Sequence, residues 1–464
     1  MSHSKKLIQD TMLYTVAQFG SRILLFLMLP FYTHYFSPDE FGIWDLTVTT
    51  IAFLTPFISM EIIAAVYRWL LDTENEGKRK TIISTGIYFL IKNMLIFTSI
   101  AIVILLWIPV PYGVLALLVI LTDVLYSFMQ QITRGLGKNR LFASLGIFHA
   151  IIFISVILFL IFTLNLRIEA FFYATIVANF SLTIFALFRG NIYPYISYAY
   201  REATLIKPLL AYALPIIPGA LSWWVISLAD RYFITWYLGV HDNGIFAIAA
   251  KIPAAFMLLN NVFALAWKDS AIRTFHDEEK NTYYSNVFSV LFKGLSSAVI
   301  CILLISKPLI HGFIGIAYAD AWKYGNILLI GALFHACALF WAAGFHGAKE
   351  TKPIFTSAIL GAIISILGNI LLIPLFGLYA VAGTSAISFL AVWVVRVKQA
   401  SPTFHIHIHR KVVVIAILGV SIAWGLPYVF GNVLLLLSTV GAFLLFAILW
   451  REDVWAVLGQ LKKD

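Results

Sequence analysis

Residues 81–108 read TIISTGIYFLIKNMLIFTSIAIVILLWI, and this stretch decides the class of fold. It is almost wholly apolar, and about 20 apolar residues in a helix are enough to cross the hydrocarbon core of a bilayer. We therefore expect a membrane-spanning helix here. Lys92 lies near its middle, where a basic side chain is costly, so the same stretch also bears on function.

Apolar stretches of this kind recur along the whole chain. Of the 464 residues, 61% are hydrophobic and only 12% are charged, whereas soluble proteins carry about 25% charged residues. The sequence therefore predicts an all-α polytopic membrane protein with about 14 transmembrane helices. The expected spans are 7–35, 41–67, 81–108, 113–132, 142–164, 170–188, 207–238, 244–267, 284–305, 323–344, 354–373, 378–397, 412–429 and 433–450.

The net charge of +10 lies mainly in the short connections between these spans. Basic residues gather in alternate connections, for example at Lys78–Lys80, Arg134–Arg140 and Arg396–Lys411. Because cytoplasmic loops of membrane proteins are enriched in Lys and Arg, this alternation predicts that both termini are cytoplasmic. The charge is thus a topology signal, and we expect no nucleic-acid partner.

The chain repeats itself after six expected spans. The turn YFSPDEFGIW at Tyr35–Trp44 aligns with YLGVHDNGIF at Tyr237–Phe246, and both end on glycine, isoleucine and an aromatic residue. Parallel repeats are typical of transporters that bind substrate where the repeats meet. We expect two lobes of six helices each, followed by a pair of extra helices, with boundaries at 1–200, 201–400 and 401–464.

Prolines concentrate in the first two spans of each predicted lobe. A proline inside a helix frees a backbone carbonyl and bends the helix, so these spans are expected to be bent. The bends could act as hinges of a moving bundle or as static kinks, because membrane helices tolerate proline well. The prolines concerned are Pro30, Pro56, Pro215, Pro218 and Pro253.

Five basic residues fall inside expected spans, and they are the strongest indication of function. A lysine or arginine costs roughly 2.5–3.5 kcal/mol at the centre of a membrane helix, so such residues usually face a water-filled cavity. We expect a cationic cavity for a negatively charged substrate, with guanidinium suited to bidentate phosphate recognition. The candidate substrate contacts are Arg22, Lys92, Arg231, Lys251 and Lys293.

Depth along the helices suggests partners for some of these residues. Lys92 and Asp123 lie at similar heights in neighbouring spans, so they are expected to pair, either as a structural ion pair or at the substrate. In the second repeat, Lys293 corresponds to Lys92 and His335 corresponds to Asp123. We assign Asp123 and His335 a structural or relay role.

Arg22 has no acidic residue at its own depth, which makes it the strongest candidate for an anion contact. Glu61 lies nearer the cytoplasmic side and shares a helix face with Arg68, seven residues on, so these two are expected to pair. Glu61 therefore also has a structural or relay role.

Asp230 allows two interpretations. Pairing with Arg231 or Lys251 would make it structural. Facing Asn369 and Thr384 would instead create a site for a coupling cation, because hard cations prefer carboxylate and amide oxygens.

The remaining motifs carry less weight. His405, His407 and His409 would place three imidazoles on one side of an extended chain, but a cytoplasmic connection explains them better than a metal site. Cys301 and Cys337 lie in apolar runs and form no disulfide framework or metal motif. No Walker A sequence is present, so no ATPase is expected. Tryptophans near span ends fit interfacial anchoring, namely Trp107, Trp267, Trp322 and Trp450.

Several motifs resemble the oligosaccharide repeat-unit flippases of the polysaccharide-transporter branch of the MOP superfamily. They are FGSR at 19–22, SPDEFG at 37–42, and LPIIPG at 214–219 followed by DRY at 230–232. The resemblance covers about the first 400 residues. It implies a two-lobed bundle with a central cavity and no enzymatic activity. It also implies flipping of undecaprenyl-pyrophosphate-linked oligosaccharides to the periplasmic leaflet of a bacterial inner membrane.

We therefore predict an alternating-access flippase for surface polysaccharide such as O-antigen, capsule or exopolysaccharide. Coupling to Na⁺ or H⁺, with no other cofactor, is extrapolated from relatives of this family. Polysaccharide polymerase and chain-length proteins are the expected partners. The alternatives are a lipid II-type flippase and a cation-coupled multidrug exporter, although the surplus of basic groups disfavours an exporter of organic cations. A glycan polymerase or ligase would carry a large periplasmic loop, which the sequence lacks.

Overall fold

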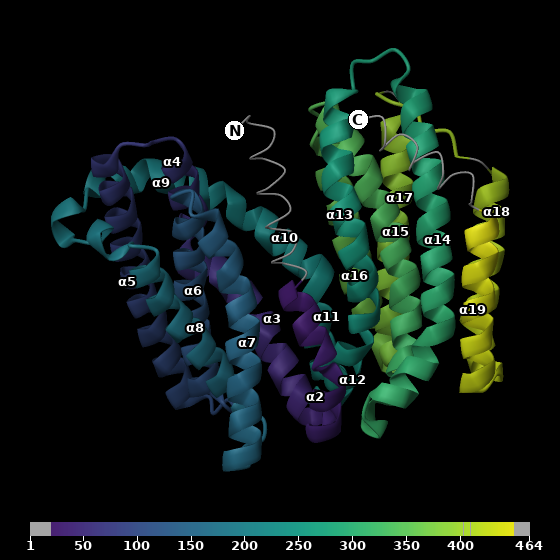
Figure 1. Cartoon of the computed structure of the whole chain (residues 1–464), viewed down its shortest axis with the longest axis horizontal. Helices are drawn as coiled ribbons and strands as arrows, with labels where there is room; N and C mark the ends of the chain where they lie inside the picture. The colour runs from purple at the N-terminus through teal and green to yellow at the C-terminus, as the bar shows by residue number, and fades with distance from the viewer. Residues whose placement is uncertain (1–19, 402, 409, 450–464) are drawn as a thin grey trace. The chain divides into compact units, whose positions relative to one another are not determined.

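The computed structural model describes residues 20–401, 403–408 and 410–449, and their regular secondary structure is helical (Figure 1). Twelve of the helices are long and apolar enough to cross a membrane. The chain divides into two compact units, which are described separately below. A side chain is called exposed when no other part of the protein covers it, so an exposed residue of a membrane-spanning helix can face either lipid or water.

The N-terminal unit comprises residues up to Tyr32 together with Ile43–Leu228. Its core forms where α4, α5 and α6 meet: a methyl group on Gly86 would strike Val66 and Phe128, so close helix packing requires glycine there. The helices are residues 20–27, α2 (Leu29–Tyr35), α3 (Pro38–Ser59), α4 (Ile62–Leu71), α5 (Glu76–Trp107), α6 (Gly113–Gly135), α7 (Asn139–Leu164), α8 (Glu169–Arg189), α9 (Ile206–Ala213) and α10 (Ile217–Leu228).

The segment between α8 and α9 is tied to α5. It forms three short 3₁₀ helices, η1 (Tyr193–Tyr195), η2 (Tyr198–Tyr200) and η3 (Ala203–Leu205). The Ser84 hydroxyl donates to the Tyr195 carbonyl at 2.6 Å, and Thr85 Oγ1 accepts from the Glu202 amide at 3.0 Å. Two polar residues of a membrane helix thus hold the connection in place.

The C-terminal unit comprises Thr33–Gly42 and Ala229 onwards. Its centre is α15, the most deeply buried span, which contacts α13, α14 and α17. The two last helices pack on α14 (Figure 1). The short helix η4 (Leu214–Ile216) belongs to the N-terminal unit, between α9 and α10. The helices of the C-terminal unit are α11 (Asp230–Tyr237), α12 (Val240–Ala249), α13 (Lys251–Arg273), α14 (Lys280–Phe313), η5 (Ile316–Tyr318), α15 (Ala321–Gly347), α16 (Lys352–Phe376), α17 (Leu378–Ala400), α18 (Arg410–Val429) and α19 (Asn432–Leu449).

The predicted class of fold, an all-α multi-pass membrane protein, is confirmed. The twelve candidate helices start with α3 and end with α18, and α19 is a shorter apolar helix. Much of the first expected span, 7–35, lies outside the described residues. The total of fourteen spans, and the location of both termini, therefore stay predictions.

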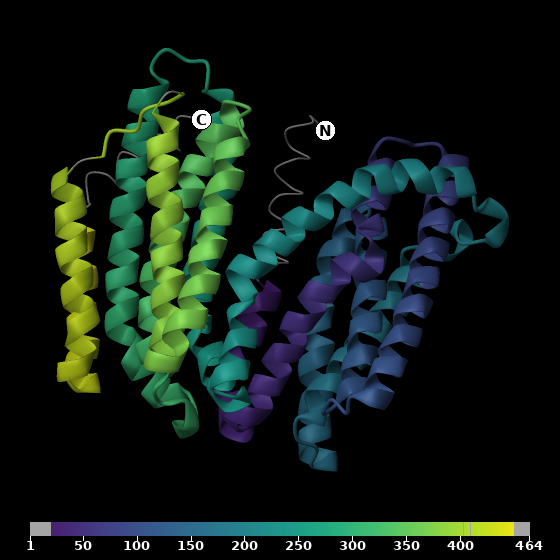
Figure 2. The ribbon, with the colours of Figure 1, turned by 180° about the vertical axis from the view of Figure 1, so that it is seen from behind.

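The helices differ in continuity. Those in the first two expected spans of each half are interrupted, whereas α5, α6, α7 and α8 run unbroken, as do α14, α15, α16 and α17 (Figure 2). The interruptions lie at Met28, at Met60–Glu61, at η4 and Ala229, and at Ala250.

Proline explains some of these interruptions and not others. Pro215 lies in η4, and Pro253 lies in the first turn of α13 just after the break at Ala250. Pro56, in contrast, lies inside α3, which continues to Ser59. The break in the second expected span follows at Met60 and Glu61, both with positive φ.

The tryptophans predicted as interfacial anchors differ in their exposure. Trp107 is 84% exposed, as an anchor would be. Trp267 and Trp322 are buried, and Trp267 Nε1 donates to the Phe340 carbonyl at 3.1 Å while its ring stacks on Phe340. Anchoring is therefore wrong for these two, which belong to packed regions of the C-terminal unit. Trp450 lies outside the described residues.

Candidate functional site

The first polar group in the C-terminal unit is a buried ion pair at the start of α11. Arg231 NH1 donates to Asp230 Oδ1 at 2.7 Å, and the two residues are 8% and 7% exposed. The guanidinium also lies 5.1 Å from the centroid of the Phe246 ring. Of the partners considered for Asp230, the structure shows Arg231. Adjacent residues of a regular helix diverge by about 100°, but here the helix only begins at Asp230, and the long Arg231 side chain turns back.

The second polar group joins α16 to α17. Thr384 Oγ1 donates to Asn369 Oδ1 at 2.7 Å, and both side chains are buried. Three apolar residues, Ile234, Ile373 and Val381, belong to one buried cluster.

The helix that begins at Asp230, α11, contacts both α16 and α17. Asp230 precedes Ile234 by four residues, Asn369 precedes Ile373 by four, and Thr384 follows Val381 by three. Residues three or four apart share a helix face, and α17 runs opposite to α11 and α16. Each of the three polar residues is thus three or four positions along its helix from a residue of this cluster. A carboxylate, an amide and a hydroxyl are suitable ligands for a hard cation.

The other basic residues of the membrane-spanning helices have different environments. Lys251 begins α13 and Lys293 lies in α14, and both are half-buried within the C-terminal unit. Arg22 is exposed in the N-terminal unit. Lys92 is also exposed, on the face of α5 that carries Leu95 and Ile96. Arg22 likewise shares its helix face with the exposed Leu25 and Phe26, so the two basic residues have similar surroundings.

Two predicted ion pairs are wrong. In the described part of the chain, Lys92 and Asp123 form no ion pair, although Asp123 is half-buried in α6. Arg68 pairs with Asp72 on α4 instead of with Glu61. The Lys92–Asp123 prediction failed because equal depth along two helices does not fix the directions of the side chains. The Glu61–Arg68 prediction failed because Asp72, four residues after Arg68, is a nearer partner.

Glu61 and His335 have the following surroundings. Glu61 is half-buried at the break before α4, where its backbone N–H donates to Ser59 Oγ at 3.1 Å. The ring of His335 stacks on Phe389, with centroids 4.5 Å apart. A relay role for either residue stays a prediction.

The two repeated turns pack against each other within the C-terminal unit. A methyl group on Gly42 would overlap the Val240 carbonyl oxygen, and one on Gly244 would overlap the carbonyl oxygen of Pro38. Asn243 Nδ2 donates to the Gly42 carbonyl at 2.9 Å. The glycines that align in sequence are thus the residues at which the two turns cross.

Further contacts fix the first of these turns. His241 Nδ1 lies 3.0 Å from Asp39 Oδ2 on the surface. The Tyr318 hydroxyl donates to the Phe36 carbonyl at 3.0 Å, and the Gly315 amide donates to Thr33 Oγ1 at 3.1 Å. Residues Thr33–Gly42 therefore belong structurally with the C-terminal unit, although they lie early in the chain.

Sequence reasoning missed two features. Arg396 was counted as a loop charge, yet it is only 6% exposed and lies in α17, where it donates to Ser357 Oγ at 2.9 Å and to the Ala338 carbonyl at 2.7 Å. Its position four residues before the helix end was the available signal. The left-handed backbone at Met60 and Glu61 had no signal, since neither residue favours that conformation.

Comparison with known proteins agrees with this architecture. Residues 7–267 match the family model described as polysaccharide biosynthesis protein, which is more than half of the chain. No curated protein sequence matches the chain.

Solved structures with the same fold include the lipid II flippase MurJ in an inward closed conformation. That similarity has a TM-score of 0.71 at 16% identity and covers 96% of this chain and 100% of that one. An inward-facing multidrug resistance MATE transporter of the MOP superfamily gives a TM-score of 0.64 at 13% identity, over 82% and 93% of the two chains. A MOP-superfamily transporter from Pyrococcus furiosus Vc1 gives 0.57 at 13% identity, over 89% and 96%.

Proposed function

The chain belongs to the polysaccharide biosynthesis protein family, and from this premise we propose that it is a flippase for polyprenyl-pyrophosphate-linked oligosaccharides. Its fold is that of MOP-superfamily transporters, in agreement with the prediction that the protein is a transporter and not an enzyme. The observation that carries the proposal is the combination of this family with a fold shared over almost the whole length of both chains with a lipid II flippase.

The physical task explains why such a protein would be built this way. A pyrophosphate and a many-hydroxyl glycan cannot cross hydrocarbon without a large desolvation cost. A bundle with basic residues at membrane depth offers the headgroup a polar path, while the polyprenyl tail stays in lipid. We propose alternating access, with the repeat unit moving from the cytoplasmic to the periplasmic leaflet of a bacterial inner membrane.

The basic residues divide into stronger and weaker candidates for the pyrophosphate. Arg22, Lys251 and Lys293 are the stronger set. Arg231 is partly neutralised by Asp230, whereas Lys251 and Lys293 are half-buried and Arg22 supplies a guanidinium. We therefore propose Arg22 as the principal phosphate contact, since guanidinium matches phosphate in a bidentate manner.

Coupling to Na⁺ or H⁺ is proposed at Asp230, Asn369 and Thr384. The support is the Asn369–Thr384 hydrogen bond, the packing of α11 against α16 and α17, and the oxygen ligands that the three residues supply. Because Asp230 already pairs with Arg231, a bound cation would compete with that guanidinium. Cation binding would then change the charge balance at the interrupted helix α10–α11.

A multidrug exporter is the second candidate, because MATE transporters share the fold. Organic cations need an acidic or aromatic site, and the candidates here are mostly basic. Polysaccharide polymerase and chain-length proteins are proposed partners, and the glycan would be a surface polysaccharide.

The proposal is tested by removing the gene from a host that has no redundant flippase. We expect lipid-linked repeat units to accumulate on the cytoplasmic leaflet, with restoration by the wild-type chain and by Lys78→Ala, an exposed residue in the first turn of α5. Arg22→Ala and Lys293→Ala should restore less than a tenth of the flux. Normal surface polysaccharide in the deletion strain would contradict the proposed function, whereas full activity of both alanine variants would contradict only the cationic site.

A further inference from the structure

A groove in the N-terminal unit follows one face of α8, the span that ends at Arg189. Its lining residues are three, four, seven and eight positions after the first of them, so they form a single stripe along the helix. Phe148 of α7 packs edge-on against this stripe, with its ring centroid 6.0 Å from that of Phe185. The groove has a volume of about 630 Å³, within the range of ordinary ligand sites. The lining residues are Ser181, Ile184, Phe185, Phe188 and Arg189.

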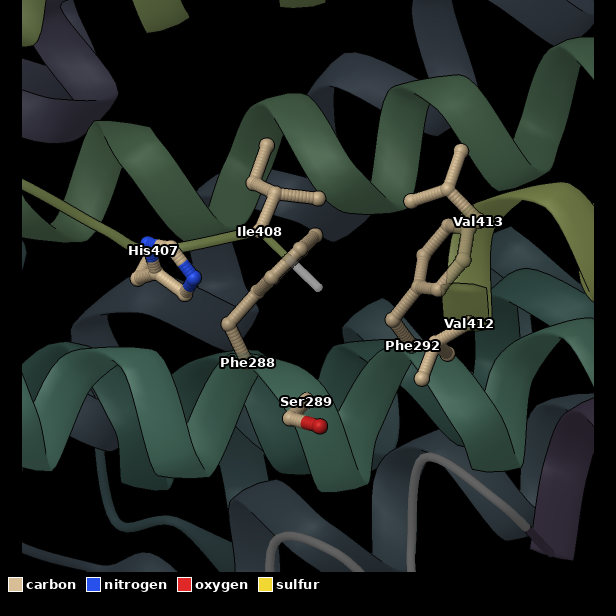
Figure 3. Close-up of a pocket in the computed structure, with 7 residues that line it drawn as sticks. All are labelled: Phe288, Ser289, Phe292, His407, Ile408, Val412 and Val413. Carbon is tan, nitrogen blue, oxygen red and sulfur yellow. The ribbon is translucent and has the colours of Figure 1, made fainter. Parts of the chain in front are cut away.

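A pocket of the C-terminal unit shows by contrast what a closed space offers. Phe288 and Phe292 of α14 line it, together with Val412 of α18 and His407 of the preceding connection (Figure 3). His409 of the same connection lies outside the described residues. The pocket measures about 10 Å³, which is room for roughly one water molecule. It cannot hold an organic ligand, whereas the groove on α8 can.

The apolar part of the groove is suited to a lipid chain. It lies on a helix that is long and apolar enough to cross a membrane. The side chains of Phe185 and Phe188 are 37% and 63% exposed, so no other part of the unit fills the space above them. From Ser181 to Arg189 the groove runs about 12 Å along the helix, which accommodates part of an acyl chain.

The polar end of the groove carries a guanidinium that the helix itself does not use. The Gly190 amide donates to the Ala186 carbonyl at 2.9 Å, and the Ile192 amide donates to the Leu187 carbonyl at 2.8 Å. Lys138 Nζ donates to the Gly190 carbonyl, so the end of α8 already has a basic partner. In the described part of the chain, the exposed Arg189 guanidinium makes no hydrogen bond or ion pair. It is therefore available to an anion from outside, beside the second positive charge of Lys138.

A tyrosine stands next to this charge. The Tyr193 ring lies 6.0 Å from the Phe188 ring, and Tyr193 is 54% exposed. Tyrosine and arginine at the end of a span are typical of the membrane–water interface, where lipid phosphates lie. The hydrogen bond from Ser84 to the Tyr195 carbonyl holds η1, and with it Tyr193, in place. The site is thus formed before a ligand binds, which lowers the entropic cost of binding.

We propose that the groove on α8 binds an anionic phospholipid of the surrounding membrane. Its phosphodiester pairs with the Arg189 guanidinium, a group that matches phosphate in a bidentate manner. One acyl chain lies along Ile184, Phe185 and Phe188, where it covers apolar surface that the protein leaves open. Basic pockets at the ends of spans recognise anionic headgroups in this way. This lipid is a resident of the N-terminal unit and is distinct from a transported one.

The site is tested by native mass spectrometry of the full-length protein, delipidated in detergent and titrated with palmitoyl-oleoyl phosphatidylglycerol. We expect the first bound lipid to have a dissociation constant about fivefold lower than that of the matched phosphatidylcholine, because choline offsets the phosphate charge. Arg189→Gln should remove this preference, and Arg189→Lys should keep most of it. Phe188→Ala should weaken the binding of both lipids about threefold, because it removes apolar contact area.

Two matched variants serve as controls. Arg201→Gln removes the same charge from the connection that follows α8, and Phe159→Ala removes an exposed ring of α7 outside the groove. Both should bind lipid as the wild type does. Because all the substituted side chains are exposed, equal melting temperatures without added lipid would show that the variants are folded.

Several results would overturn the proposal. They are equal affinity of the wild type for the two phospholipids, an unchanged preference in Arg189→Gln, and an equal loss of preference in Arg201→Gln. Displacement of the bound lipid by equimolar glycerol phosphate would assign the site to a free phosphate instead. Tighter retention of a polyprenyl pyrophosphate than of phosphatidylglycerol would assign it to the transported lipid.

Discussion

The interrupted helices and the continuous helices of this protein differ in more than their proline content. Pro308, Pro374 and Pro427 lie inside unbroken α14, α16 and α18. The break at Met60–Glu61, in contrast, contains no proline, and both residues adopt the left-handed conformation. Proline alone therefore does not decide where a membrane helix is broken.

The polar groups occur on both sides of this division, because the Asn369–Thr384 pair joins the continuous helices α16 and α17. The Asp230–Arg231 pair lies at the start of α11, where the helix is interrupted, and the crossing of Gly42 with Gly244 lies where α3 and α12 begin. The continuous helices instead supply extended packing surfaces, as in the burial of α15. The interrupted helices thus carry the buried ion pair and the crossing of the turns, whereas continuous α15 is the most deeply buried span.

The largest effect is expected from breaking the buried ion pair. Asp230→Asn leaves the Arg231 guanidinium buried without its carboxylate, which typically costs about 3–5 kcal/mol. The melting temperature of the purified protein, followed by tryptophan fluorescence, should fall clearly. Asp72→Asn is the control, because it removes an exposed pair with Arg68 and should leave the melting temperature nearly unchanged. Equal decreases in melting temperature for the two variants would show that the buried pair at α11 stabilises the protein no more than the exposed pair does.

A smaller but definite loss is expected where the repeated turns cross. Gly42→Ala and Gly244→Ala each place a methyl group against a carbonyl oxygen, and such overpacking costs roughly 1–3 kcal/mol. Thermal unfolding should show a similar loss for both, since the crossing is symmetric. Gly146→Ala in α7 and Gly383→Ala in α17 meet nothing within 4 Å and should be neutral or stabilising. Tolerance of alanine at 42 and 244 would mean that the turns do not cross so closely.

Glycine should have opposite effects at a break and in a continuous helix. Met60→Gly removes a left-handed strain of about 1–2 kcal/mol, so it should raise the melting temperature or leave it unchanged. Ser99→Gly, on the exposed face of α5, should lower stability by less than about 1 kcal/mol. If Met60→Gly destabilised more than Ser99→Gly, the left-handed break would not be the native conformation.

The smallest effect is expected at the surface contact of the two turns. His241 and Asp39 are about half exposed, and exposed pairs contribute little. His241→Gln should therefore leave both transport and thermal unfolding close to wild type, in contrast with Gly244→Ala nearby. If His241→Gln lowered thermal stability as much as Gly244→Ala, the surface pair and not the helix crossing would hold the two turns together.

Much of this fold could be predicted from the sequence, because membrane helices follow directly from long apolar stretches. The repeat was also visible in the glycines at 42 and 244. The direction of side chains could not be predicted. Lys92 and Asp123 were expected at the same depth, but the way each side chain points around its helix depends on tertiary packing, which the local sequence does not specify. The same reason explains Trp267, which lies near a helix end but is buried against Phe340. Asn369 and Thr384 were brought together as expected, since both lie at the same height in consecutive helices.

Reconstitution tests the central claim most directly. The purified chain would be placed in vesicles that contain a polyprenyl-pyrophosphate-linked oligosaccharide, and the fraction of glycan open to a membrane-impermeant glycosidase would be followed over time. The account predicts that the inner-leaflet half becomes accessible only with the protein present, and at least tenfold more slowly with Arg22→Ala than with Lys78→Ala. The proposed flippase function would be contradicted if the inner-leaflet glycan stayed protected from the glycosidase in vesicles that contain folded wild-type protein under the proposed coupling gradient.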